Sequence, residues 1–172
     1  MRKGTTVALL LIVLGLAGGA AALAALATGF SGYEISPGSA CGDQTCGTTF
    51  AGWTNAAGSS WVPRRQSNGG HWLARINYRG TPGIGRSVEI TGGSFAWVEA
   101  NGTAHYGPIT GGTVTWPSSL SENIGCGAGV ARVSATIAEG ATPGSITGCL
   151  DDTHIRQGVF PPRIWGALTL GA

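Results

Sequence analysis

Two glutamates beside a predicted hairpin are the first residues whose spacing could serve catalysis. Glu89 and Glu99 lie on either side of Gly92-Gly93, and glycoside hydrolysis uses two carboxyl groups about 5 to 10 Å apart. If Gly92-Gly93 forms a two-residue loop, the two carboxyl groups point to opposite faces of the sheet, because successive strand side chains alternate. Glu99 then faces Arg86 as a cross-strand ion partner. The pattern therefore favours ordinary strand residues over a catalytic acid pair.

The other residues with catalytic or metal-binding chemistry are scattered. His71, His105 and His154 stand singly, and the chain has neither a G-x-S-x-G nucleophile elbow nor a P-loop. The adjacent pair Asp151-Asp152 supplies too few oxygens for a calcium ion, which takes six to eight ligands. We expect no metal and no cofactor, and the residues favour a protein without catalytic activity. A small secreted hydrolase stays open as an alternative.

The four cysteines have two possible uses. An even number of cysteines in an exported protein indicates disulfides, and we favour Cys41 with Cys46 and Cys126 with Cys149. A zinc site is the alternative, because Cys41 with Cys46, and Cys149 with His154, fall at the edge of the usual ligand spacing. That arrangement leaves Cys126 without a partner, so we expect disulfides.

Tryptophan offers a binding chemistry instead of a catalytic one. Exposed aromatic rings form flat apolar platforms that can stack on sugar faces, whereas a buried ring adds a large apolar area to a core. Trp72 and Trp165 lie within predicted strands, so we expect them in the core. The remaining four lie near predicted turns and are our candidate ligand-binding residues: Trp53, Trp61, Trp97 and Trp116.

An N-terminal leader places these side chains outside the cytoplasm. Arg2 and Lys3 precede an uncharged apolar segment that ends in Ala25-Leu26-Ala27, an A-x-A cleavage signature. We expect residues 1–27 to form a hydrophobic leader helix that is cleaved after Ala27. A retained membrane anchor is the alternative, because the uncharged segment exceeds the roughly 20 residues that span a bilayer. In both cases the protein is extracellular or on the cell surface.

The remaining domain, residues 28–172, has no net charge. The chain has ten basic and eight acidic residues, and removing Arg2 and Lys3 leaves eight of each. A nucleic-acid-binding protein would carry a basic stripe, and Arg64-Arg65 is the only adjacent basic pair in residues 28–172. We therefore expect no nucleic-acid partner, and contact with a membrane only through an uncleaved leader.

Short strands separated by glycine and proline make up this single domain. The segment 71–79 alternates, with Trp72, Ile76 and Tyr78 on one face. We interpret Gly92-Gly93 and Gly111-Gly112 as loops of β-hairpins, Asn101-Gly102 as another turn, and the glycines in general as turn residues. The pattern predicts an all-β, disulfide-containing domain with an antiparallel β-sandwich, and a β-barrel is the alternative.

These observations support three functional hypotheses. The first is an exported, non-catalytic binding module, with polysaccharide as a ligand held by some of the four candidate tryptophans. The second is a structural or self-associating subunit of the cell envelope that binds other envelope proteins, because low net charge weakens repulsion between molecules. The third is the small secreted hydrolase.

Overall fold

The protein folds into eight β-strands. The computed structural model describes residues 26–36, 46–55, 69–122, 125–153 and 161–171. Residues 1–25 of the predicted leader helix lie outside these ranges, as do Trp61, Cys41 and His154, whereas Leu26 and Ala27, at the predicted cleavage site, belong to the first strand. The strands are β1 (Leu26–Ser36), β2 (Cys46–Thr54), β3 (Gly70–Arg79), β4 (Ser87–Val98), β5 (Ala104–Thr115), β6 (Ala131–Glu139), β7 (Thr142–Asp151) and β8 (Arg163–Leu170).

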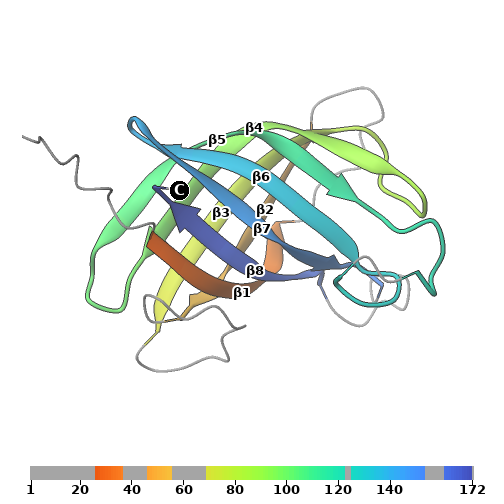
Figure 1. The fold of residues 1–172 in the computed structure, drawn as a ribbon, viewed down its shortest axis with the longest axis horizontal. Helices are drawn as coiled ribbons and strands as arrows, with labels where there is room; N and C mark the ends of the chain where they lie inside the picture. The colour runs from red at the N-terminus through yellow and green to blue at the C-terminus, as the bar shows by residue number, and fades with distance from the viewer. Residues whose placement is uncertain (1–25, 37–45, 56–68, 123–124, 154–160, 172) are drawn as a thin grey trace, which may run out of the picture.

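These strands close into one barrel. Each strand pairs antiparallel with the next in the chain, and β8 pairs with β1 from Leu26↔Leu170 to Tyr33↔Arg163. Figure 1 shows the first strand, in orange-red, beside the last, in dark blue. The predicted sandwich is therefore wrong and the barrel alternative is confirmed. Closure pairs both of the edges that an open sheet would leave exposed.

The period-two pattern of the strands determines which side chains fill the barrel. Along β3 the alternate residues from Trp72 to Ile76 are buried, as predicted, and Tyr78 is half-buried. A barrel of eight strands has an interior just wide enough to be filled by side chains or to hold one small ligand. The largest fully buried side chains are Trp97, Phe30, Ile90, Ile109, Ile146, Ile164 and Leu168.

Two predicted hairpin loops are instead interior parts of long strands. β4 runs through Gly92-Gly93 and β5 runs through Gly111-Gly112, and the pairing of β3 with β4 shifts register beside Gly92. Gly93 has φ +146°, and a Cβ atom there would lie 2.0 Å from the carbonyl oxygen of Arg75. These glycines permit β-bulges that bend the strands, which a closed barrel requires. The actual β4–β5 turn contains Asn101-Gly102, as predicted, and Val98 pairs with Ala104.

Other glycines bring neighbouring strands together inside the barrel. Gly32 pairs with Gly52 across β1 and β2, and a Cβ atom on Gly32 would lie 2.3 Å from the carbonyl oxygen of Ala51 and 2.8 Å from the Trp72 ring. Only glycine fits such an approach. The interpretation of the glycines as turn residues is therefore wrong for these positions.

A disulfide joins the β5–β6 connection to β7. Cys126 and Cys149 are bonded, as predicted. Cys46 is also disulfide-bonded, whereas its predicted partner Cys41 lies outside the described residues. No helix among the described residues is long and apolar enough to cross a membrane.

Candidate functional site

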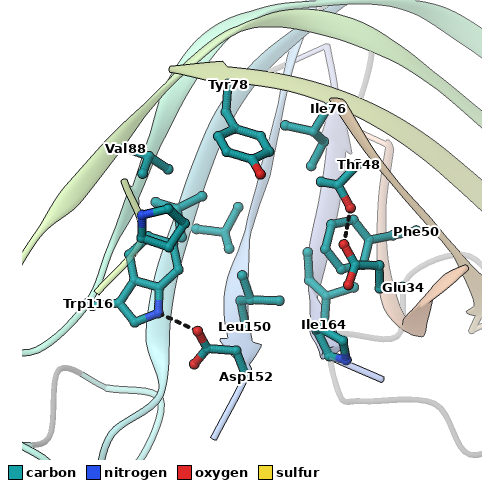
Figure 2. Close-up of a pocket in the computed structure, with 14 residues that line it drawn as sticks. Glu34, Thr48, Phe50, Ile76, Tyr78, Val88, Trp116, Leu150, Asp152 and Ile164 are labelled. Atoms are coloured by element: carbon teal, nitrogen blue, oxygen red, sulfur yellow. Dashed lines mark hydrogen bonds between the residues drawn. The ribbon is translucent and has the colours of Figure 1, made fainter. Parts of the chain in front are cut away.

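One end of the barrel contains a cavity of about 170 Å³, here called the end cavity. Its walls are largely apolar, and its polar side chains come from a few positions. Figure 2 shows the Tyr78 hydroxyl pointing into the space between the Trp116–Asp152 pair on one side and the Glu34–Thr48 pair on the other. The lining residues are Glu34, Thr48, Phe50, Ile76, Tyr78, Pro82, Val88, Val114, Trp116, Val133, Leu150, Asp152, Pro162 and Ile164.

The polar groups at the rim come from the four strands that run toward this end. Glu34 and Tyr78 lie near the ends of β1 and β3, and Trp116 and Asp152 directly follow β5 and β7. Each continues the inward period of its own strand: Trp116 follows inward Val114, and Asp152 follows inward Leu150. At this end of each of the four strands, the inward-facing position therefore carries a polar group.

A hydrogen bond fixes the Trp116–Asp152 side of the rim. The Trp116 indole Nε1 donates to Asp152 Oδ2 at 2.9 Å, and the ring is only 6% exposed. The backbone N–H of Trp116 donates to the Arg86 carbonyl, and Gly85 N–H donates to the Pro117 carbonyl. The β3–β4 and β5–β6 connections thus hold the indole in place.

The opposite side carries a second carboxylate. The Thr48 hydroxyl donates to Glu34 Oε1, and both side chains extend into the end cavity. Burial raises the pKa of Tyr78, and the charge of Glu34 raises it further. The Tyr78 hydroxyl therefore stays protonated at neutral pH and can both donate and accept a hydrogen bond.

The three candidate tryptophans within the described residues do not gather on one exposed face. Trp97 is 1% exposed inside the barrel, far along β4 from the end cavity, whereas Trp116 lines that cavity. Trp53 is half-buried on the outer face of β2. Trp165, predicted in the core, is half-buried on the outer face of β8, where the Arg163 guanidinium lies 5.2 Å from its ring centroid.

At the opposite end of the barrel, the side chain of His105 contacts two carboxylates. His105 Nε2 lies 2.8 Å from Glu99 Oε1, and its Nδ1 lies 3.0 Å from Glu139 Oε2. The predicted pairing of Glu99 with Arg86 is therefore wrong, because it assumed the loop at Gly92-Gly93. Burial lowers the pKa of His105, but the hydrogen bonds and charges of Glu139 and Glu99 outweigh it and raise the pKa.

The two adjacent aspartates at the end of β7, Asp151 and Asp152, have different hydrogen-bond partners. Asp151 Oδ1 accepts hydrogen bonds from the backbone N–H and hydroxyl of Thr153, while Asp152 faces Trp116. No group of three or more histidine, cysteine or acidic side chains within the described ranges is arranged to hold a metal ion.

Sequence reasoning missed Glu34 and did not identify Tyr78 and Asp152 as site residues. The sequence signal for Tyr78 and Asp152 was the alternation of inward- and outward-facing residues. It places Tyr78 on the same face of β3 as Ile76, and Asp152 on the same face of β7 as Leu150. That signal identifies a site only when the strands close into a barrel, because closure brings the ends of β1, β3, β5 and β7 together.

Comparisons of the chain with family models, with curated proteins and with solved structures found no match in any of the three.

Proposed function

We propose that this protein binds one small organic molecule in the end cavity without transforming it. The observation that carries the proposal is an apolar cavity, open at one end of a closed barrel, with a few polar side chains around its rim. Apolar walls with few, well-placed polar groups are the usual composition of small-molecule sites. This composition supports a binding function in the interior of the barrel.

The size of the end cavity limits the ligand. A buried apolar cavity of about 150 Å³ accommodates benzene, and the end cavity measures about 170 Å³. It therefore suits a ligand whose apolar part is about one ring in size and whose polar part lies at the rim.

The unfilled space also has an energetic consequence. At about 24 cal/mol per Å³, a closed void of this size would destabilise a core by about 4 kcal/mol, and an opening to solvent reduces that cost. Val88, Val114 and Val133 line the space, and larger aliphatic side chains at these positions would fill it. The small side chains favour binding over stability.

Filling the end cavity from its wall tests the proposal. Val133 is 1% exposed and lines the cavity, so Val133→Phe should place a ring where the ligand binds. Val98→Phe is the matched control, because Val98 is 38% exposed on the outer surface. We expect calorimetric titration with benzyl alcohol and cyclohexanol to show saturable binding that Val133→Phe abolishes and Val98→Phe retains, with both variants folded by circular dichroism. Absence of saturable binding to the unmodified protein would refute the proposal.

A second candidate function, polysaccharide binding, rests on the outer surface of β1, β2 and β8. Trp53 and Trp165 both pair with Ser31, one from each side, which places their Cα atoms two strand spacings, about 10 Å, apart. Ser31 is only 4% exposed between them. Two adjacent aromatic rings on the outer sheet surface suit stacking on successive sugars.

The two candidate functions predict different variants to lose binding. A polysaccharide site predicts that Trp53→Ala abolishes retention on insoluble glycans while Val133→Phe has no effect. Retention by the Trp53→Ala variant equal to that of the unmodified protein, or no retention of either, would refute the glycan function.

A further inference from the structure

A second cavity adjoins the end cavity. It measures about 220 Å³, is partly open to solvent, and is here called the side pocket. Trp116 and Asp152 line both spaces, so this hydrogen-bonded pair, visible in Figure 2, forms the boundary between them. The other described residues that line the side pocket are Ile84, Pro117, Leu120, Gly129 and Thr153.

The walls of the side pocket are mainly apolar and come from connections between strands. Ile84 lies between β3 and β4, and Leu120 lies between β5 and β6. Both are large apolar residues that are exposed, whereas the other exposed large apolar residues within the described ranges all lie on strands. A ligand that covers Ile84 and Leu120 would remove apolar area from water, which is favourable.

Several bonds hold these connections in place around the side pocket. The backbone N–H of Gly85 donates to the Pro117 carbonyl at 2.7 Å, which joins the β3–β4 connection to the β5–β6 connection. A disulfide attaches the β5–β6 connection to β7. Asp151 Oδ1 accepts hydrogen bonds from the backbone N–H and the hydroxyl of Thr153. These bonds preorganise the pocket, which lowers the entropy cost of binding a ligand there.

We propose that the ligand of this protein has two ring-sized apolar groups, one in the end cavity and one in the side pocket, joined by a short polar linker beside Asp152. This inference rests on the proposed function, because it extends the ligand of the end cavity into a second space. A cavity of about 150 Å³ accommodates benzene, and each of the two spaces exceeds that volume. At the boundary, the carboxylate of Asp152 can accept a hydrogen bond from an N–H or O–H group of the linker.

Two neutral amides that differ by one ring test the role of the side pocket. N-Benzylacetamide carries one ring and N-benzylbenzamide carries two, with the same amide linker. In calorimetric titration of the protein, we expect N-benzylbenzamide to bind at least tenfold more tightly, because the side pocket removes its second ring from water. Val133→Phe fills the end cavity and should weaken the binding of both amides.

Polar substitutions in the wall of the side pocket locate the second ring. Ile84→Gln and Leu120→Gln should each reduce the affinity for N-benzylbenzamide at least fivefold and change the affinity for N-benzylacetamide less than twofold. Leu73→Gln is the matched control, because Leu73 is 41% exposed and Ile84 is 42% exposed. Leu73 lies on the outer face of β3, so its substitution should change neither affinity.

The outcomes separate this inference from the proposed function. Equal affinities of the unmodified protein for the two amides, or losses in Ile84→Gln and Leu120→Gln no larger than in Leu73→Gln, would overturn the two-group ligand. The small-molecule function stands in that case if N-benzylacetamide still binds and Val133→Phe abolishes its binding. Absence of saturable binding for both amides, benzyl alcohol and cyclohexanol would overturn the two-group ligand and the proposed function together.

Discussion

The two ends of this barrel are built from the same eight strands and differ in what fills them. At the packed end, Trp97 is 1% exposed, its ring centroid lies 4.8 Å from that of His105, and Glu99 and Glu139 bind the histidine. At the open end, Glu34 and Asp152 line a cavity and accept hydrogen bonds from Thr48 and Trp116. The acidic groups contact a histidine at one end and border a cavity at the other.

This difference separates stability from binding along the barrel axis. Large rings fill the middle and the packed end, where Phe30 and Trp72 contact edge to face at 4.6 Å and Trp72 Nε1 donates to the Ser31 carbonyl. Valines surround the open end. Buried rings provide most of the packing energy of a small core, so the packed end can stabilise the strands whose other ends hold the cavity open.

The largest expected effect comes from removing a tryptophan at each end. Trp97→Ala should lower the free energy of unfolding by about 4 kcal/mol, because it empties a filled core. Trp116→Ala should lower it by about 2 kcal/mol, because one side of that ring already borders a cavity and makes fewer contacts. Urea denaturation followed by circular dichroism measures both values. A loss for Trp116→Ala equal to or larger than that for Trp97→Ala would break the comparison.

Adding a methyl group at Gly32 tests whether the close approach of β1 and β2 contributes to the stability of the barrel. Gly32→Ala should lower the free energy of unfolding by about 3 kcal/mol, because its Cβ atom would collide with the Ala51 carbonyl and the Trp72 ring. Gly47→Ala is the matched control: it lies on the exposed face of β2, and the nearest atom to its Cβ is the flexible Asn77 Oδ1 at 3.3 Å. If both variants unfold at the same urea concentration as the unmodified protein, close approach at Gly32 has no energetic role.

The disulfide provides a comparable effect at the open end. Cys126 and Cys149 are separated by 23 residues, so replacing both with serine should lower the free energy of unfolding by about 3 kcal/mol through added freedom of the unfolded chain. The variant should also weaken ligand binding, because the bond anchors the connection that begins at Trp116. Unfolding and titration of the double variant measure the two effects. Unchanged ligand affinity in the folded variant would show that the bond stabilises the barrel without shaping the site.

Much of the fold follows from local pattern. The alternation of segment 71–79 correctly predicts β3, and the Cys126–Cys149 pairing and the turn at Asn101-Gly102 are confirmed. The sandwich prediction failed because strand spacing is the same in sandwiches and barrels, and closure depends on the β1–β8 pairing between distant parts of the chain. Gly92-Gly93 misled because a glycine pair suits a tight turn and a strand bulge equally well.

The site was harder to predict than the fold. Glu34, Tyr78 and Asp152 are distant in sequence. They come together only because β1, β3 and β7 run in the same direction around the closed barrel and end at the same rim. Trp116 was selected as a binding residue for its place near a turn, and the structure puts its ring inside the barrel rim. Whether it contacts a ligand remains a prediction.

The smallest expected effect is the pH dependence of the packed end. The pKa of His105 is higher in the folded protein than its ordinary value of 6.5, because the contacts with Glu139 and Glu99 outweigh burial. The folded state therefore binds this proton more tightly than the unfolded chain, and the resulting stabilisation is fully present below pH 6.5 and is lost as the pH rises through the folded-state pKa. We expect His105→Gln to be less stable than the unmodified protein by about 1 kcal/mol at low pH, a typical value for a partly exposed ion pair.

Urea denaturation at several pH values between 5 and 9 checks this expectation. The difference in unfolding free energy between the unmodified protein and His105→Gln should shrink as the pH rises. His71→Gln serves as the control, because it removes a histidine that is exposed on the outer face of β3, away from the contacts of His105. Because His105 lies at the packed end, His105→Gln should leave ligand affinity at the open end unchanged at every pH tested. A parallel loss of binding in His105→Gln would show that the two ends are coupled through the strands that join them.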